Sequence, residues 1–397
     1  MKRPKLATIK TCTGCLACVD ICPQKALSYY TANDGFVYVK CNEIKCVLCH
    51  KCERTCPVVN GIKYSSNTLS SSIPYSLYLT NSEYYNHSTS GGAFAALSLD
   101  FIKSGGYICG TILTDNGQLR HVISNDIADI AKMQGSKYIQ SDTSKIYIEI
   151  KKILEADKKI LFFGMGCQVA AVLSFFRNNK NKKNLYTVDI ICGGVPTRLL
   201  TETFIKKEPQ YTRISNFRIK DKYVLSCYDN TGKIVHLKGK RTLPLYGFCS
   251  NLTKRYSCGD CRFCGIERMS DITIGDYWGD KENDGIHKSV VIVHTDKGKE
   301  PLLYLNHVVI KSIDWSFIRH NYRYVIGKNY NNNRLQRKML AWMFEHLSYH
   351  ALCGIYGCNL KNPFWFAITT YNHIIAKLQK TYINHVLKGI ISKIPNK

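Results

Sequence analysis

The sequence lacks any apolar run long enough to cross a membrane as a helix. The longest such stretch, from Leu161 to Phe176, is interrupted by Gly164, Gly166 and Gln168. It stays short of the roughly 20 residues that a spanning helix needs, and we interpret it as a buried strand followed by a helix. The first 14 residues are basic and polar with no apolar stretch behind them, which argues against a secretory signal or transit peptide. We therefore expect a cytoplasmic protein.

Acidic residues are scarce relative to basic ones. The chain has 29 Asp and Glu against 55 Lys and Arg, a formal net charge of +26. Such a surface suits an acidic carrier protein, a phosphate-bearing cofactor, an anionic membrane surface or nucleic acid, and a plain solvated basic surface is an equal alternative. No nucleic-acid-binding motif occurs, so nucleic acid ranks lowest among these partners.

Cysteine, in contrast, is abundant. Its 19 residues fall largely into short regular spacings within a long chain, which favours metal ligation over a disulfide framework. The pattern Cys-x2-Cys-x2-Cys-x3-Cys-Pro occurs twice between residues 12 and 57. This spacing lets a tight loop present three thiolates to one 4Fe-4S cubane while the fourth cysteine of the loop ligates the other cubane.

The two repeats therefore predict two crossed ligand sets. The first set is Cys12, Cys15, Cys18 and Cys56, and the second set is Cys46, Cys49, Cys52 and Cys22. Structural zinc is the alternative, and it is less favoured because zinc sites usually pair two Cys-x2-Cys elements. Five cysteines stand outside any regular spacing, and we interpret most of them as thiols with no special role: Cys41, Cys109, Cys227, Cys353 and Cys358.

A third group of cysteines lies further along the chain. Cys167 and Cys192 each follow a predicted strand, and the carboxyl ends of parallel strands gather at one edge of a sheet. With Cys258 and Cys261 they form a third set able to hold another 4Fe-4S cluster, and Cys264 and Cys249 are spares or alternates. A small zinc ribbon at residues 258–264, or buried thiols that only pack, are the alternatives.

Composition divides the chain into four parts. We predict a ferredoxin-type domain at 1–62, a polar linker at 63–74, a larger domain at 75–330 and a helical basic tail at 331–397. In the larger domain, strand-like runs at 107–113, 159–163 and 185–191 alternate with helical patterns at 144–156, 167–178 and 197–207. This alternation predicts a parallel sheet, and the later runs at 223–228 and 233–237 predict a hairpin.

The expected fold class is therefore mixed. It combines a small pseudo-symmetric 4Fe-4S ferredoxin-like domain with a larger mixed α/β domain that has a partly parallel sheet. Two glycine-containing segments, 88–94 and 164–168, lead into helical runs and could seat phosphates at a helix start. Neither has the GxGxxG spacing, so by themselves they favour plain connections.

Five ordered segments resemble the family of coenzyme F420 hydrogenase/dehydrogenase beta subunits, whose members join a ferredoxin module to a flavin-binding reductase domain. They are STSGGAF at 88–94, QGSKYIQS at 134–141, LFFGMGCQVA at 161–170, DIICGGVP at 189–196 and SDITIGDYWG at 270–279. The resemblance covers most of the chain. It implies FAD bound by the 75–330 domain, an extra 4Fe-4S cluster beside it, and electron exchange between iron-sulfur carriers and a two-electron acceptor.

The resemblance also implies positions for the flavin. By position, Ser90, Gly91, Gly92, Lys137 and Asp276 would fall near it. Lys137 is the candidate catalytic residue, because a cation near the pyrimidine edge would stabilise a reduced anionic ring. A plain surface cation is the equal alternative for Lys137.

Two positions depart from the family pattern. Gly166 stands where the family has proline before the first cysteine, and Gly193 stands where it has histidine after the second. The first change loosens a loop, and the second removes a proton donor that works near neutral pH. The acceptor is thus coenzyme F420 or another small molecule, and some bacterial relatives are associated with cell-surface polysaccharide synthesis.

Two functions follow from these observations. The first is a flavin-dependent iron-sulfur oxidoreductase acting on a small-molecule acceptor. The second is a non-catalytic relay protein without flavin, which docks on a larger reductase or an electron-carrier protein through its positive surface. Surface docking on a membrane through residues 362–397 is a third option, and an ordinary packed helix is favoured there.

Overall fold

The computed structural model describes residues 3–61, 72–115, 117–238, 242–249, 253–265, 267–280, 284–322, 325 and 340–355. Most of the predicted linker at 63–74 lies outside these residues. Of the predicted tail at 331–397, residues 340–355 form α13 (Leu340–His346) and α14 (Tyr349–Ile355), and the rest lies outside. The proposed domain boundaries therefore stay predictions. Every helix in the described part is too short or too polar to span a bilayer.

The N-terminal domain repeats one loop geometry. Each repeat ends in a short helix, α1 (Ala17–Asp20) or α2 (Lys51–Thr55), and an antiparallel pair of β1 (Leu27–Thr31) with β2 (Val37–Cys41) lies between them. Leu16 and His50, at equivalent positions after the second cysteine, have φ of 58° and 56°. Non-glycine residues adopt this left-handed conformation only where the surroundings require it. The sequence repeat is therefore also a structural repeat.

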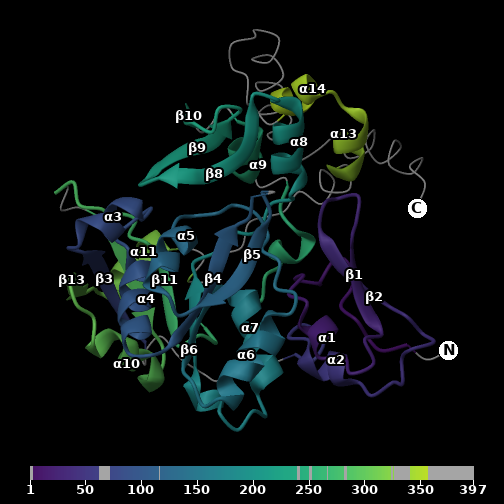
Figure 1. Cartoon of the computed structure of the whole chain (residues 1–397), viewed down its shortest axis with the longest axis horizontal. Helices are drawn as coiled ribbons and strands as arrows, with labels where there is room; N and C mark the ends of the chain where they lie inside the picture. Colours follow the sequence, from purple (N-terminus) through teal and green to yellow (C-terminus); the bar gives the residue numbers. More distant parts are fainter. Residues whose placement is uncertain are drawn as a thin grey trace.

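The larger domain is built on an eight-stranded mixed sheet in the order β13-β3-β12-β11-β7-β6-β4-β5 (Figure 1). The four central strands β4, β6, β7 and β11 are parallel, and the strands at both edges are antiparallel. This confirms the predicted partly parallel sheet. The strands are β3 (Ile73–Leu79), β4 (Tyr107–Leu113), β5 (Leu119–Ser124), β6 (Ile160–Met165), β7 (Leu185–Ile190), β11 (Ile272–Asp276), β12 (Ser289–Val293) and β13 (Val308–Ser312).

Helices cover both faces of this sheet. The side chains of each strand point alternately to the two faces, so one strand contributes to two separate cores. Along β6, Leu161 and Phe163 pack in one core with α4 (Ala93–Lys103), whereas Ile160 and Phe162 pack in a second core with α6 (Ile146–Glu155) and α7 (Gly166–Phe176). The second core also contains Cys15 and Ala17 of the N-terminal domain. That domain, purple in Figure 1, therefore packs beside α6 and α7.

A smaller three-stranded antiparallel sheet lies over the main sheet (Figure 1). It consists of β8 (Tyr211–Ile219), β9 (Lys222–Asp229) and β10 (Ile234–Lys238), and the predicted hairpin joins the last two. Its core is shared with α8 (Leu199–Lys207) and α9 (Leu243–Cys249). The remaining helices are α3 (Ser82–His87), α5 (Ile130–Met133), α10 (Asp296–Leu303) and α11 (Trp315–Asn321), with 3-10 turns at Ile127–Asp129, Lys182–Asn184 and Tyr256–Cys258.

Candidate functional site

The structure brings the four cysteines of the first set together. Burial raises the pKa of Cys15 to about 11, and the neighbouring thiols of Cys56 and Cys12 add to the rise. Burial likewise raises the pKa of Cys18, followed by the effects of Cys15, Cys12 and Cys56. Cys56, from the second repeat, therefore lies among three cysteines of the first, which is the crossing that the spacing predicts. Such a grouping of sulfurs is the donor chemistry of a 4Fe-4S cubane.

The second set also gathers, around a small cavity. Cys22, Cys46, Cys49 and Cys52 all line it, and the backbone N–H of Ala26 donates to Cys22 Sγ at 3.3 Å. Cys41 lies beside this set: burial raises its pKa to about 11, and Cys46, Cys52 and Cys22 raise it further. No spacing in the sequence indicated that proximity, because Cys41 reaches the set through the pairing of β1 with β2.

The third set forms at the edge of the main sheet. Cys167 is the second residue of α7, which follows β6 directly, and Cys192 follows β7, so the two cysteines lie at the ends of neighbouring strands. Burial raises the pKa of Cys167 well above its usual value, and Cys261, Cys192 and Cys258 contribute in that order. Backbone N–H groups of Gly194 and Val195 donate to Cys192 Sγ at 3.3 Å and Cys258 Sγ at 3.4 Å.

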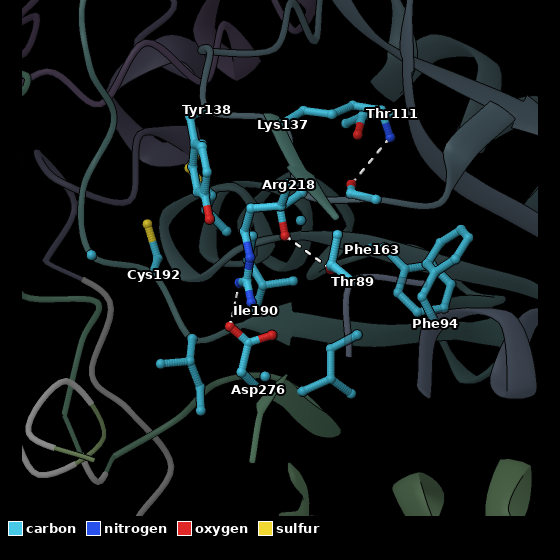
Figure 2. Close-up of a pocket in the computed structure, with 18 of the residues that line it drawn as sticks. Thr89, Phe94, Thr111, Lys137, Tyr138, Phe163, Ile190, Cys192, Arg218 and Asp276 are labelled. Carbon is cyan, nitrogen blue, oxygen red and sulfur yellow. Dashed lines mark hydrogen bonds and ion pairs between the residues drawn. The ribbon is translucent and has the colours of Figure 1, made fainter. Parts of the chain in front are cut away.

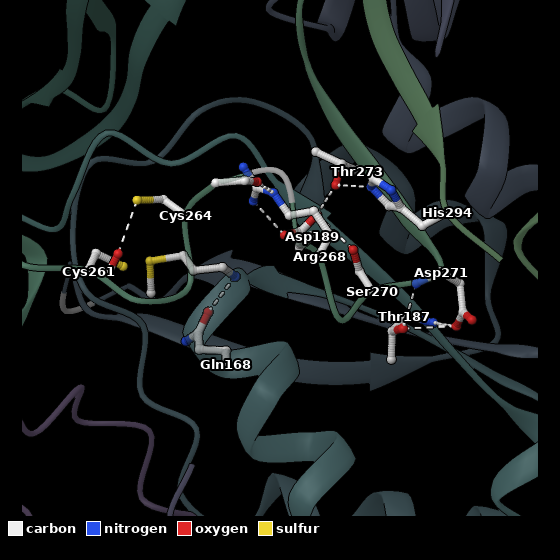
Figure 3. Close-up of polar contacts among 12 residues, drawn as sticks. Gln168, Thr187, Asp189, Cys261, Cys264, Arg268, Ser270, Asp271, Thr273 and His294 are labelled. Carbon is white, nitrogen blue, oxygen red and sulfur yellow. Dashed lines mark hydrogen bonds and ion pairs between the residues drawn. The ribbon is translucent and has the colours of Figure 1, made fainter. Parts of the chain in front are cut away.

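Cys264 stands next to the third set. Its thiol donates to the carbonyl of Cys261 at 3.2 Å (Figure 3). Over the described residues, no three histidine, cysteine, aspartate or glutamate side chains form a group able to hold a single metal ion. Which four cysteines would ligate a cluster here therefore remains a prediction.

A buried ion pair lies behind the third set (Figure 3). Arg268 Nη1 donates to Asp189 Oδ2 at 2.8 Å, with both side chains only 2% exposed. Arg268 Nε also donates to the carbonyl of Gly265 at 2.9 Å, which ties the loop after Cys264 to β7. The hydroxyls of Ser270 and Thr273 donate to Asp189 Oδ1. A buried charge pair needs such additional donors to offset its loss of hydration.

Gly166 is closely packed rather than loosely placed. A Cβ at this position would lie 2.6 Å from the carbonyl oxygen of Phe263, in the loop that carries Cys261 and Cys264. Real Cβ atoms do not approach backbone this closely, so only glycine fits here. The expected loosening of the loop at Gly166 is therefore wrong, because this glycine allows two cysteine-bearing segments to meet.

The first set lies beside the third set. Cys15 contributes to the raised pKa of Cys167, so these two sets are neighbours. The carbonyl of Cys15 accepts hydrogen bonds from Thr143 Oγ1 at 2.8 Å and from the hydroxyl of Tyr147 at 2.6 Å. Arg255, which is 1% exposed, donates to the carbonyl of Cys12 at 2.6 Å. The first set therefore faces the larger domain.

A cavity of about 480 Å³ lies beside the third set, between the carboxyl ends of the parallel strands and the small sheet (Figure 2). Its size is that of a typical cofactor site. Of the residues expected near a flavin, Ser90, Gly92, Lys137 and Asp276 line it. Gly91 is not among the lining residues, and a Cβ there would lie 2.1 Å from the carbonyl oxygen of Leu77. Cys192 belongs to both the cavity wall and the third set.

The N-terminus of α4 opens into this cavity. Ser90 Oγ and Ser289 Oγ are 2.8 Å apart, and Thr89 Oγ1 and Ser136 Oγ are 3.1 Å apart. Gly92 precedes the helix with φ of 91°, a conformation that favours glycine. Hydroxyl groups beside the positive end of a helix suit an anionic group.

Lys137 is half-buried at the wall of the cavity, and its catalytic role stays a prediction. Its Nζ donates to the carbonyls of Met133 at 2.8 Å, Gln134 at 2.7 Å and Gly135 at 3.3 Å. Burial lowers the pKa of Lys137 to about 7. Asp276 in turn accepts from Arg218 Nη1 at 2.5 Å (Figure 2), so the predicted acidic residue is paired with a cation that the sequence did not indicate.

Two buried acceptor atoms belong to residues that line the cavity. Gln134 Nε2 donates to the carbonyl of Tyr84 and to Ser88 Oγ, which leaves Oε1 without a partner among the described residues. His121 Nε2 lies 3.0 Å from the carbonyl of Phe163, and Nδ1 likewise has no partner there. Burial lowers the pKa of His121 to about 4, so near neutral pH Nδ1 is an acceptor. Both atoms are almost fully covered by neighbouring protein atoms, so a ligand in the cavity would reach them only through a shift of these side chains.

An aromatic wall closes another side of the cavity. The rings of Tyr138 and Phe248 stack with centroids 4.1 Å apart and an interplanar angle of 18°. Tyr223 from β9 lies next to Tyr138, at 6.0 Å between ring centroids. These residues come from separate elements, so no local pattern in the sequence could have identified them together.

Comparison with known proteins finds matches to two parts of the chain. Residues 11–60 match the 4Fe-4S dicluster domain, and residues 157–309 match the family described as the C terminus of the beta subunit of coenzyme F420 hydrogenase/dehydrogenase. A component of the F(420)H(2) dehydrogenase of Methanosarcina mazei is 25% identical over 201 residues, which are 48% of this chain and 56% of that relative. The chain thus spans little more than half the length of that relative.

A solved structure also resembles this chain. It belongs to the F420-reducing NiFe hydrogenase complex of Methanosarcina barkeri, with 17% identity, a TM-score of 0.44, and coverage of 71% of this chain and 89% of that chain. The chain therefore carries a match to the 4Fe-4S dicluster domain followed by a region similar to the C terminus of coenzyme F420 hydrogenase/dehydrogenase beta subunits.

Proposed function

We propose that this protein is an iron-sulfur flavoprotein oxidoreductase that exchanges electrons between 4Fe-4S clusters and a two-electron acceptor. The observation that carries the proposal is the continuity of its sites. Cys52 of the second set lies near Cys18 of the first, the first set neighbours the third through Cys15 and Cys167, and Cys192 joins the third set to the cavity.

The cysteines would hold the clusters as three sets. The eight cysteines of the first and second sets would take one cubane for each set, and Cys167, Cys192, Cys258 and Cys261 would take the third. Backbone N–H groups already directed at Cys22, Cys192 and Cys258 would stabilise thiolate charge. The Asp189–Arg268 pair would hold the third loop in register with β7.

The cavity residues would hold FAD. The volume of the cavity, the serine hydroxyls at α4 and the stacked aromatic pair suit a large planar cofactor with an anionic pyrophosphate. Bound there, a flavin would couple one-electron carriers to a two-electron acceptor. Lys137, half-buried at the same wall, would favour negative charge on the bound group when its ammonium carries its proton.

The acceptor would be coenzyme F420 or another small molecule. The relative from Methanosarcina mazei bears the name F(420)H(2) dehydrogenase, which supports testing that coenzyme first. The family histidine replaced by Gly193 is not restored by His121, because the low pKa of His121 keeps it unprotonated near pH 7. A proton for the acceptor would therefore come from another group or from water.

Anaerobic purification followed by iron and flavin counting tests the proposal. We expect about twelve iron atoms and one FAD per chain, since each cubane holds four irons. Cys192→Ser should lose about four irons, whereas Cys227→Ser, in the core of the small sheet, should lose none. About eight irons without flavin would instead support a relay protein that docks on a larger reductase. A colourless preparation containing zinc would contradict both functions.

A further inference from the structure

The second set is the outer end of the cluster path. Cys49 is the only exposed cysteine among the three sets, and the others are half-buried or buried. The first set faces the larger domain through hydrogen bonds to the carbonyls of Cys12 and Cys15. An electron that enters or leaves the protein by way of the clusters therefore has its shortest route to solvent at the loop around Cys49.

This loop exposes apolar side chains. Ile44 is 95% exposed and Val47 is 62% exposed, on either side of Cys46. Single exposed apolar residues are ordinary on protein surfaces, but two beside the outer cysteine are placed where a partner would come closest. Their burial against a partner would also exclude water between the two redox centres.

Unpaired positive charge surrounds these apolar residues. Lys25, Lys40, Lys45 and Lys51 are exposed, and none forms an ion pair with a described residue. The two acidic residues of the loop are already engaged. Glu43 pairs with Arg3, and Glu53 accepts from His50 at 2.9 Å and from the backbone N–H of Lys5 at 2.7 Å. The charge left available at this surface is therefore positive.

We propose that the surface of Ile44, Lys45, Val47, Cys49 and Lys51, the docking face, binds an acidic one-electron carrier protein. Carboxylates of the carrier would pair with Lys45 and Lys51, and an apolar patch around its redox centre would cover Ile44 and Val47. The transfer makes and breaks no bond, because one electron leaves the carrier and one cluster at the second set gains it. The proposal rests on the proposed function only in requiring a cluster at that set.

Stopped-flow reduction of the full-length holoprotein tests the docking face. The probe is a reduced acidic two-iron ferredoxin, mixed under anaerobic conditions at low and at high ionic strength. Lys45→Glu and Lys51→Glu should each slow the second-order rate roughly fivefold or more at low salt, with the difference fading as salt screens the charges. Ile44→Asp should slow the reaction at both ionic strengths, because it removes an apolar contact.

Lys103→Glu is the matched control. Lys103 is exposed at the end of α4, an element that packs on the main sheet away from the N-terminal domain (Figure 1). This variant should react within about twofold of the unmodified protein, because its charge is beyond the screening length from the second set. Rates for Lys45→Glu and Lys51→Glu that match Lys103→Glu would overturn the proposal.

Reduction by dithionite separates this failure from failure of the proposed function. Unmodified protein and all variants should be reduced fully and equally by dithionite, as followed by bleaching of the iron-sulfur absorbance. No such bleaching in the unmodified protein would refute the proposed function itself. Normal bleaching with no reaction toward the ferredoxin would refute the docking face alone. Salt-sensitive sedimentation with phosphatidylserine vesicles that Lys45→Glu abolishes would also overturn it, in favour of a membrane surface.

Discussion

Replacing Arg268 by methionine should destabilise the region that holds the third cysteine set. The substitution leaves Asp189, 2% exposed, without its cation, and the breaking of a buried ion pair typically costs about 3–5 kcal/mol. The hydroxyls of Ser270 and Thr273 still donate to Asp189, so we expect about 3 kcal/mol, the lower end of that range. The loop at Gly265 also loses its hydrogen bond from Arg268.

Native-state hydrogen exchange of the anaerobic protein measures this effect locally. A multidomain cofactor protein has no single unfolding free energy, so exchange of amides in β7 and β11 is a better readout than a melting point. A free energy of local opening that is lower by about 3 kcal/mol corresponds to amide exchange that is faster by about two orders of magnitude. Iron bound at the third set should decrease in parallel.

The double variant with Asp189→Asn and Arg268→Met is the control. It removes both charges, so most of the lost protection from hydrogen exchange should be recovered although Arg268 is still missing. Lys299→Met breaks an exposed pair with Asp296 and should leave exchange in β7 unchanged. If Arg268→Met alone exchanges at the rate of the unmodified protein, or if the double variant is no better than the single one, the buried pair does not hold this region.

Two further changes test the cysteine sets and the cavity. Cys56→Ser should lose about four irons and the electron paramagnetic resonance signal of one cluster, because Cys56 belongs to the crossed first set. The control, Cys41→Ser, should keep all its iron. Equal iron contents in the two variants would contradict the crossing. Lys137 has a pKa near 7 in the folded protein against an ordinary value of 10.5. Between these two pH values Lys137 is protonated in the unfolded chain but not in the folded protein. The free energy of unfolding should therefore rise with pH from about 7 toward 10.5. Lys137→Met should flatten that rise, as measured by native-state hydrogen exchange of amides next to residue 137 at successive pH values, corrected for the intrinsic pH dependence of exchange. An unchanged slope would show that Lys137 stays protonated in the folded protein.

Local patterns in the sequence predicted those strands, helices and turns whose formation depends mainly on residues adjacent in the chain. The strand at Tyr107–Leu113 was expected at its observed limits, because its β-branched and apolar residues fit a buried strand. The helix after β6 and the hairpin of β9 with β10 were expected for similar reasons of periodicity and turn chemistry. The repeat of left-handed residues at Leu16 and His50 follows from the repeat in sequence.

Contacts between distant segments could not be predicted in this way. Arg218 reaches Asp276 across 58 positions, and Cys41 approaches the second set only because β1 pairs with β2. The unpaired acceptors of Gln134 and His121 become visible only when the surrounding atoms are known. Gly166 appeared to loosen a loop until the carbonyl of Phe263 was found against it.

The sequence by itself determined the candidate cluster ligands, because ligand type and spacing are local properties: two cysteine loops of ferredoxin spacing and five segments that resemble coenzyme F420 hydrogenase/dehydrogenase beta subunits are visible in the letters. Only the tertiary structure decided how the cysteine sets follow one another, which acceptor atoms lack partners among the described residues at the cavity, and which set is exposed to solvent. Those properties depend on burial and on packing between segments far apart in the chain, and no single segment carries them.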